Sequence, residues 1–371
     1  MAEKIKVLVL FGGQSGEHEV SLISATSVVE NLDREKFEII TAGIGLDGRW
    51  LVGSNALDAL KSRADFSQLT AFTLANRNEG GYLVPLCGGE LSQSKIDVVF
   101  PVLHGPLGED GALQGMLDMM GIPYVGAGVL GSALGMDKAA MKDVFRAQGI
   151  LTPPYALILR SIWELHRQSV LDSLLGHFKL PLFIKPANMG SSVGITKAHD
   201  EKELMTGLDE AAKHDRRLLV EACVSMEGGN AREFEVAVLG NDSPQASVVG
   251  EVVPGAEFYD YSDKYQDEKA RLLIPADIPP ELGERIRQTA CRAFAALDLA
   301  GMARVDFLYG SVGDGASELY LSEVNTIPGF TKISMYPKLW EASGLPYTEL
   351  LTKLVELALE RNKEIKRHHR A

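Results

Sequence analysis

The chain has 371 residues, with 50 acidic and 37 basic side chains and therefore a formal net charge of −13 at neutral pH. Single hydrophobic cores stop growing below this length, so we expect two or three domains, and the negative charge argues against a nucleic-acid partner. No apolar run approaches the roughly 20 residues that cross a bilayer, and the first apolar run is too short for a signal peptide, so we expect a cytoplasmic protein without membrane association. The three cysteines are widely spaced and form no C-x-x-C motif, which predicts reduced thiols and no zinc site.

The first part of the chain alternates strand and helix patterns. Strands are predicted near residues 5–11, 37–44, 96–102 and 122–125, and helices near 18–31 and 111–120. This alternation is typical of an open parallel sheet, so we predict an N-terminal α/β domain over residues 1–127.

A glycine-rich turn follows the first strand, in the stretch LVLFGGQSGEHEVSL at residues 8–22. A strand, a glycine turn and a helix often bind phosphate, but the stretch has neither G-x-G-x-x-G nor the G-K-[ST] ending of a Walker loop. Glu17 and Glu19 instead place negative charge in the first turn of the helix. Two interpretations stay open: Ser15 caps the helix and the carboxylates complement its dipole, or a carboxylate at this turn binds a cation such as a substrate ammonium.

Two further units are predicted after the first. The central unit, residues 128–219, is a second α/β domain, with a helix from residue 136, strands at 156–159 and 180–185, and helices at 161–177 and after residue 200. The third unit, residues 220–371, is rich in strands and predicts a mixed-sheet α+β domain. Its strands are expected near 218–224, 232–240, 245–253, 302–309 and 318–324, and its helices near 280–297 and 346–361.

Two late segments, GMARVDFLYG and LYLSEVNTIPG, read as strands joined by a glycine-rich turn near residues 310–316. If they pair as a hairpin, the period of two brings Asp306, Glu323 and Asn325 together on one face, beside Arg304. Two carboxylates and an amide are hard-oxygen ligands that suit Mg²⁺ shared with phosphates. The alternative is a polar face exposed to solvent, which is disfavoured because an arginine sits among the acids, as expected of a group that stabilises developing negative charge.

A nucleotide would need cations and loop amides near such a metal. Lys185 ends a predicted strand and is followed by the loop KPANMGSSVG, which includes Ser191 and Ser192. Lys138 stands at a helix start, where the dipole disfavours a cation unless an anion is bound. On its own, such a loop is more often a simple turn.

These segments together resemble the D-alanine–D-alanine ligases of the ATP-grasp superfamily. The resemblance covers about residues 5–360 and rests on these motifs, in this order: GGQSGEHEVS, HGPLGEDGALQG, MDK, KPANMGSSVG, YDYSDKY, ARVDFL and EVNTIPGFT. One departure is that 12 residues, 309–320, separate Leu308 from Leu321, which predicts a longer hairpin turn than the family signature usually allows.

The resemblance implies a three-domain ATP-grasp ligase that makes D-alanyl-D-alanine for peptidoglycan precursor synthesis. In such ligases ATP phosphorylates the carboxylate of a first D-alanine, and the amine of a second D-alanine attacks the acyl phosphate, giving ADP and phosphate. Glu17 would bind the first amino group with His104 nearby, and would form a hydrogen-bonded set with Ser191 and Tyr265. The second carboxylate would meet Lys264, Ser334 and the Met335 amide.

The resemblance also assigns the nucleotide and metal residues. Lys138 and Lys185 would hold phosphates, Glu221 the adenine edge and Glu233 the ribose. Ser191, Ser192 and Lys264 would complete the nucleotide site. Two Mg²⁺ ions, with Mn²⁺ as an alternative, would bind Asp306, Glu323 and Asn325. Arg304 and the Gly329 amide would stabilise the tetrahedral oxyanion. The family expectation for quaternary structure is a homodimer.

The stretch AEFYDYSDKYQDEK at residues 256–269 fits a lid that closes over the site and excludes water, the alternative being an ordinary aromatic loop. In the resemblance, Lys264 and Tyr265 mark ligases that form the peptide. A ligase that uses D-lactate or D-serine as second substrate is the nearer alternative. A non-catalytic nucleotide or amino-acid sensor is the farther one.

Overall fold

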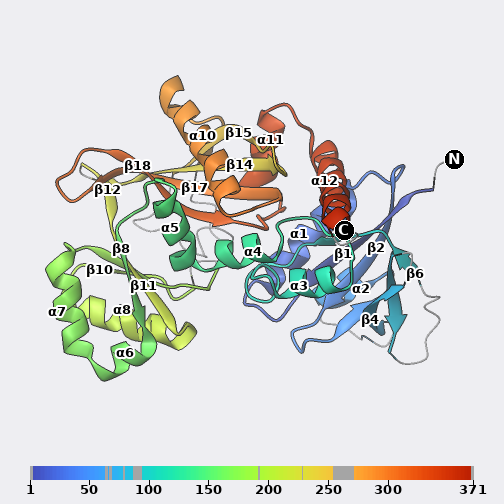
Figure 1. Ribbon diagram of the computed structural model, residues 1–371, viewed down its shortest axis with the longest axis horizontal. Helices are drawn as coiled ribbons and strands as arrows, with labels where there is room; N and C mark the ends of the chain where they lie inside the picture. Colours follow the sequence, from blue (N-terminus) through green and yellow to red (C-terminus); the bar gives the residue numbers. More distant parts are fainter. Residues whose placement is uncertain are drawn as a thin grey trace.

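Three sheets organise the described part of the chain, one after another along the sequence (Figure 1). The structure is a computed structural model that describes residues 3–62, 66, 69–77, 80–86, 94–190, 193–227, 229–253 and 271–368. None of the helices formed by these residues has the length and apolar character needed to cross a membrane.

The N-terminal sheet is parallel at its centre, as predicted. β1 (Ile5–Gly12) lies between β2 (Phe37–Ile44) and β7 (Val98–Pro101) and runs parallel to both. Alternate residues of β1 pack under α1 (His18–Asn31) on one face and under α3 (Ala112–Met119) on the other. Because helices cover both faces, the strand is apolar and buried from Val7 to Phe11. The loops that follow β1 and β7 leave from the same edge of this sheet.

An antiparallel extension, which the sequence patterns did not predict, continues the N-terminal sheet beyond β2. It has the order β2-β3-β4-β5-β6. The strand expected at 122–125 is only an isolated bridge between Val99 and Tyr124. The added elements are β3 (Trp50–Val52), α2 (Ala56–Ser62), β4 (Thr70–Arg77), β5 (Gly80–Pro85) and β6 (Ser94–Ile96).

The central unit is a four-stranded antiparallel sheet in the order β10-β9-β11-β8. The single helix expected at 161–177 is two helices that meet at His166. The strands are β8 (Tyr155–Leu159), β9 (Leu182–Pro186), β10 (Thr196–Ala198) and β11 (Arg217–Ala222). The helices, in chain order, are α4 (Val129–Met136), α5 (Lys138–Ala147), α6 (Arg160–Leu165), α7 (Arg167–His177) and α8 (Glu201–His214).

The third sheet has the order β13-β12-β17-β14-β15-β16, with β18 paired to β17. One face packs against α10 and the other against α11, so the side chains of β14 alternate between two cores. Its strands are β12 (Val224–Met226), β13 (Gly229–Asn230), β14 (Arg232–Gly240), β15 (Gln245–Val253), β16 (Arg271–Leu273), β17 (Gly301–Val312) and β18 (Glu318–Asn325). Its helices are α10 (Pro280–Ala296), α11 (Met335–Ala342) and α12 (Tyr347–His368).

The hairpin predicted between the two late segments is confirmed, but its turn is shorter than expected. β17 continues to Val312 and β18 begins at Glu318, so only residues 313–317 form the turn. The extra residues lengthen β17 instead, where Ser311 and Val312 pair with β12. The departure from the family signature therefore extends the sheet and lies away from the predicted metal residues.

The last described helix, α12, returns to the N-terminal unit and packs beside α1 and β7 (Figure 1). Leu350, Leu351 and Leu354 are fully buried in one core cluster with residues of β1 and α1. Arg361 donates a 2.7 Å hydrogen bond to the Gly126 carbonyl. The domain limits 1–127, 128–219 and 220–371 stay predictions, and placing the second limit after Ala222 would keep β11 in one unit.

Candidate functional site

Charged side chains from two sheets line one pocket of about 150 Å³. On β14, alternate residues pack under α10, which turns Glu233 and Glu235 toward the opposite face. Strand pairing then places Asp306 opposite Glu235, and Glu323 opposite Asp306. The charged residues of the lining are Lys185, Lys197, Glu221, Glu233, Glu235, Arg304, Asp306 and Glu323.

Arg304 is held between two carboxylates of this face. Its Nε and Nη2 donate to the two carboxylate oxygens of Asp306 at 2.8 and 2.7 Å, and Nε lies 3.1 Å from Oε2 of Glu235. Such a bidentate pair fixes the plane of the guanidinium. Glu235, which the sequence analysis did not single out, is thus a second partner of the predicted oxyanion arginine.

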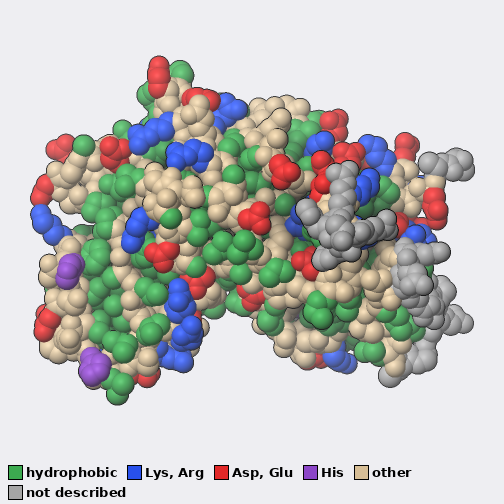
Figure 2. Space-filling view, in the orientation of Figure 1, with side chains coloured by type: hydrophobic (Ala, Val, Ile, Leu, Met, Phe, Trp, Pro, Cys, Tyr) green, Lys and Arg blue, Asp and Glu red, His purple; other side chains and the backbone are tan. Residues whose placement is uncertain are grey.

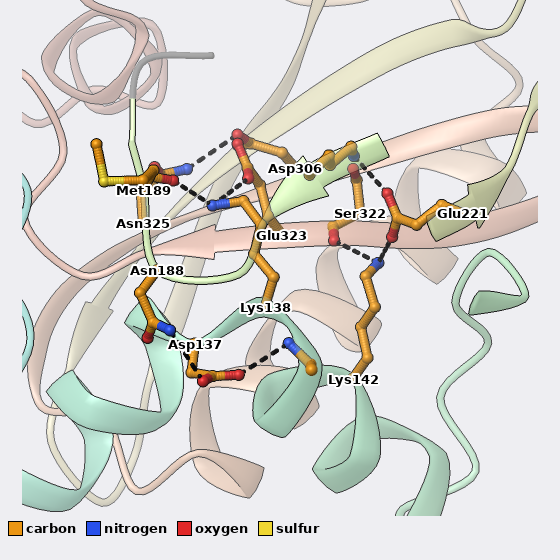
Figure 3. Close-up of polar contacts among 12 residues, drawn as sticks. Asp137, Lys138, Lys142, Asn188, Met189, Glu221, Asp306, Ser322, Glu323 and Asn325 are labelled. Atoms are coloured by element: carbon orange, nitrogen blue, oxygen red, sulfur yellow. Dashed lines mark hydrogen bonds and ion pairs between the residues drawn. The ribbon is translucent and has the colours of Figure 1, made fainter. Parts of the chain in front are cut away.

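The three predicted metal residues lie together at the paired ends of β17 and β18 (Figure 3). Asn325 donates from Nδ2 to Asp306 at 3.0 Å, and Glu323 is the pairing partner of Asp306. The register shifts between Asp306 and Phe307, which makes Ser322 the extra residue of a β-bulge.

The donor chemistry of this set fits Mg²⁺. Mg²⁺ keeps several waters and prefers one or two carboxylates plus substrate phosphates. Within the described residues, no group of three or more His, Cys, Asp or Glu side chains could hold a metal ion by itself. Asp306, Glu323 and the amide oxygen of Asn325 therefore suit an ion that is shared with a nucleotide rather than one enclosed by protein.

The start of α5 places Lys138 beside the metal residues. Asp137 caps the helix, because its side chain accepts hydrogen bonds from the backbone N–H groups of Ala139 and Ala140. Lys138 donates to the Met189 carbonyl at 2.7 Å, and its Nζ lies 3.7 Å from Glu323 (Figure 3). A cation so close to a helix N-terminus is expected where an anion is bound.

Glu221 binds two lysines in the interior. Its carboxylate pairs with Lys185 of β9 and, at 2.6 Å, with Lys142 of α5. Although burial acts to raise the pKa of Glu221, the charges of these two lysines lower it to about 2. Lys142 was not predicted as a site residue. The available signal was its place on the buried face of the helix over residues 138–147, where an apolar side chain is expected.

Glu17 lies where loops of the first two units meet. It is the N-cap residue of α1, and its side chain makes no capping hydrogen bond, whereas its backbone N–H donates to Ser15 Oγ at 3.3 Å. The contact at Ser15 is compatible with the capping interpretation, so both interpretations of this turn stay predictions. A Cβ atom added at Gly105 or at Gly190 would come within 2.6 Å of Glu17 Oε2. The carboxylate is therefore packed between the loop after β7 and the loop after β9. Ser15 Oγ also donates to the His104 carbonyl at 2.6 Å.

His104 and Glu109 contact the backbone of Ile327, two residues after the end of β18. His104 Nδ1 lies 3.1 Å from the Ile327 carbonyl oxygen, and the Ile327 N–H donates to Glu109 at 3.0 Å. Glu109 also accepts from the Gly105 N–H at 2.6 Å. Burial and the charge of Glu17 raise the pKa of Glu109 to about 8. Burial lowers the pKa of His104.

The remaining predicted residues divide into two groups. Gly329 lies against Ser334, because a Cβ at Gly329 would come within 2.7 Å of Ser334 Oγ, and Met335 begins α11 just after Ser334. Four predicted residues lie outside the described ones: Ser191, Ser192, Lys264 and Tyr265. The predicted lid at 256–269 lies there as well.

The surface is hollowed between the central unit and the N-terminal unit, and basic side chains gather on the wall formed by the central unit (Figure 2). This arrangement suits an anionic ligand that enters between the two units.

Comparisons with known proteins agree with this architecture. The family models described as "D-ala D-ala ligase N-terminus" and "D-ala D-ala ligase C-terminus" match residues 6–127 and 144–356. The D-alanine–D-alanine ligase of Heliobacterium modesticaldum is 48% identical, with 98% of this chain and 97% of that protein covered. The ligase of Thermoanaerobacter sp. strain X514 is 50% identical, with 98% of each covered.

Two solved structures have the same fold as this chain. The D-alanine–D-alanine ligase of Coxiella burnetii superposes with a TM-score of 0.84 at 36% identity, with 100% of this chain and 98% of that chain covered. The VanG D-Ala:D-Ser ligase of Enterococcus faecalis superposes with a TM-score of 0.81 at 35% identity, with 96% and 100% covered. With its fold, its motifs and nearly its full length matched, the chain belongs to the D-alanine–D-alanine ligase family.

Proposed function

We propose that this protein joins two D-alanines into D-alanyl-D-alanine at the expense of ATP, releasing ADP and phosphate for peptidoglycan precursor synthesis. The observation that carries the proposal is the charged face on which Arg304, Asp306, Glu323 and Asn325 meet, with Lys138 beside it. A sensor would bind nucleotide without needing an arginine among the metal residues.

The first half-reaction transfers the γ-phosphoryl group of ATP to the carboxylate of the first D-alanine. Lys138 and Lys185 bind the phosphates, and Glu221 and Glu233 meet the adenine and the ribose. Phosphoryl transfer asks a protein mainly for positioning and for neutralisation of charge, which this set of cations provides.

Mg²⁺, when bound by Asp306, Glu323 and Asn325, neutralises phosphate charge and orients the phosphates. We propose two ions, with Mn²⁺ able to replace Mg²⁺, because each of the two carboxylates could bind an ion that phosphate oxygens also bind.

The second half-reaction forms the peptide bond. Glu17 binds the ammonium of the first D-alanine, with His104 nearby and with Ser191 and Tyr265 joined to Glu17 by hydrogen bonds. The amine of the second D-alanine attacks the acyl phosphate, Arg304 and the Gly329 N–H stabilise the oxyanion, and phosphate leaves. Lys264, Ser334 and the Met335 N–H bind the second carboxylate.

The test is release of ADP from ATP and Mg²⁺ with D-alanine, D-serine or D-lactate as second substrate. We expect ADP release that depends on D-alanine, with D-alanyl-D-alanine as the main product. Binding of ATP without turnover in the presence of any of these substrates would support the sensor instead.

A ligase that accepts D-serine as second substrate is the other candidate, because the structural neighbour from Enterococcus faecalis carries that name. Equal mixtures of D-alanine and D-serine would distinguish the two, since the ratio of dipeptides formed reports the preference directly.

We further propose that the protein acts as a homodimer in the cytoplasm, where ATP is available, and that it binds neither nucleic acid nor membrane. Light scattering measures the oligomeric state. A monomer of full activity would contradict the dimer.

A further inference from the structure

Lys142 is a buried lysine that the proposed reaction does not use. Its side chain is 1% exposed and stands on the inner face of α5. Its ammonium lies 2.6 Å from Glu221 and donates a 2.9 Å hydrogen bond to the Ser322 carbonyl (Figure 3). Glu221 belongs to β11 of the central sheet, and Ser322 belongs to β18 of the third sheet. One side chain therefore joins the two sheets that enclose the nucleotide pocket.

The charge of Lys142 is not needed for packing. Its neighbours on the same face, Met141 and Phe145, are fully buried in an apolar cluster that already packs this helix. Burying an ammonium is unfavourable unless partners replace its water. Burial lowers the pKa of Lys142, whereas the charge of Glu221 acts to raise it. Glu221 and the Ser322 carbonyl are the partners that replace water here.

Each of the two contacts has a separate consequence. Glu221 also pairs with Lys185. Without Lys142, Lys185 would be the one lysine in the described residues that neutralises the Glu221 carboxylate. Ser322 is the extra residue of the β-bulge, and the bulge sets the register in which Glu323 faces Asp306. Bulges beside active sites commonly change the direction of a side chain. The carbonyl of this bulge accepts a hydrogen bond from Lys142, which belongs to α5.

We propose that Lys142 is a positioning residue for the nucleotide and its metal. By sharing Glu221, it leaves Lys185 able to bind phosphate, and by holding the Ser322 carbonyl, it keeps Glu323 in place opposite Asp306. This inference rests on the proposed function, since it concerns residues assigned there to ATP and Mg²⁺.

Lys142→Met tests the proposal, with Mg²⁺ and ADP as the probe in isothermal titration calorimetry. Glu221 keeps Lys185 as a partner in this variant, so the fold is expected to survive. We expect the dissociation constant of ADP to rise about 10- to 100-fold, as for loss of a charge-assisted hydrogen bond. The Mg²⁺ concentration for half-maximal activity should rise as well, while the KM for D-alanine stays near that of the wild type.

Phe145→Leu is the matched control, because it loosens the same buried face of α5 without touching Glu221 or Ser322. It should lower the melting temperature and leave ADP binding unchanged. If it weakens ADP binding as much as Lys142→Met, packing of the helix explains the effect and the proposal is wrong.

Glu221→Gln, alone and combined with Lys142→Met, separates electrostatic sharing from packing. If Lys142 acts through the charge of Glu221, the double variant should lose less ADP-binding free energy than the two single variants lose when their losses are added. Additive effects would overturn this part of the proposal. Should Lys142→Met not fold, Lys142→Gln in the same cycle gives the same decision.

Failure of this inference differs from failure of the proposed function. Wild-type protein that neither binds ADP nor releases it with D-alanine would contradict the function itself. Wild-type activity together with unchanged ADP and Mg²⁺ constants in Lys142→Met would overturn only the role of Lys142.

Discussion

Glu17 carries the first prediction at the scale of single residues. Its carboxylate lies between Gly105 and Gly190, where it can meet a substrate ammonium. Glu17→Gln keeps the shape but removes the charge, so a charge-assisted hydrogen bond of about 1.5–3 kcal/mol is lost. We expect kcat/KM for D-alanine to fall roughly 10- to 150-fold, measured by ADP release. Calorimetry should show unchanged ADP binding, and a variant that loses ADP instead would return Glu17 to a purely structural role.

Asp306 carries the second prediction. Asp306→Asn keeps the shape of a metal ligand but removes its charge, so activity should fall by orders of magnitude and recover in part at raised Mg²⁺. Recovery stays partial because the variant also weakens the pair with Arg304. The matched control is Glu318→Gln on β18, where the exposed carboxylate pairs with Arg285 at 3.0 Å, away from the pocket. Full activity of Asp306→Asn at ordinary Mg²⁺ would exclude it as a ligand.

Glu109 carries a prediction about pH. Its pKa is raised from an ordinary value of 4.5 to about 8 by burial and by the charge of Glu17. Between these values the folded protein keeps a proton that the unfolded chain releases, so the free energy of unfolding falls as pH rises through this window. Glu109→Gln stays neutral and should flatten that dependence, measured by urea unfolding at pH 5, 6.5 and 8. Parallel curves for variant and wild type would show that Glu109 is ionised in the fold.

The residues that could be predicted from the sequence are those whose signal is local. Asp306 and Glu323 follow from strand periodicity and one hairpin, so short-range pattern brings them together. Lys142 and Glu109 act through partners that are 180 and 218 residues away. No local pattern contains such contacts, although a lysine on an apolar helix face is a usable hint.

At the scale of elements, predictability followed length and periodicity. β15 and α1 were predicted closely, and both are long, with nine and 14 residues. β3 has three residues and β6 has three, too few for a period to be seen. α11 was missed because its eight residues, which include a proline, follow a turn-rich segment. No glycine or proline stands at or next to His166, so the sequence carries no local signal for the split.

The N-cap of α5 supplies the prediction at this scale. Asp137 caps the helix and also pairs with Arg217 at 2.8 Å, so it fixes the end that carries Lys138. Asp137→Ala should lower the free energy of unfolding by about 1–2 kcal/mol and raise the KM for ATP. Asp200, the N-cap of α8, accepts a hydrogen bond from the Glu203 N–H and lies in a different helix. Asp200→Ala should destabilise similarly without changing the KM, and an equal change in both variants would contradict the link to Lys138.

At the scale of the whole molecule, α12 joins the first and third units through a shared core. Leu354 is fully buried in that core, so Leu354→Ala should lower the free energy of unfolding by about 2–5 kcal/mol. Hydrogen exchange should then speed up in α1 and β1 as well as in α12. Leu208→Ala, equally buried in the central unit, is the control and should affect α8 and its sheet. Unchanged exchange in α1 of the Leu354→Ala variant would show that the units unfold separately.

The position of α12 also bears on how the protein is made. The ribosome releases the N-terminal unit first, but the helix that completes its core follows about 220 residues later. At 5–20 residues per second, that delay is about 10 to 45 s. Throughout this time the part of the first core beside α1 and β7, where α12 later packs, lacks its cover. The core of the first unit to emerge is therefore completed only after the last helix is made, and a chaperone that binds apolar surface could bind the nascent chain in that interval.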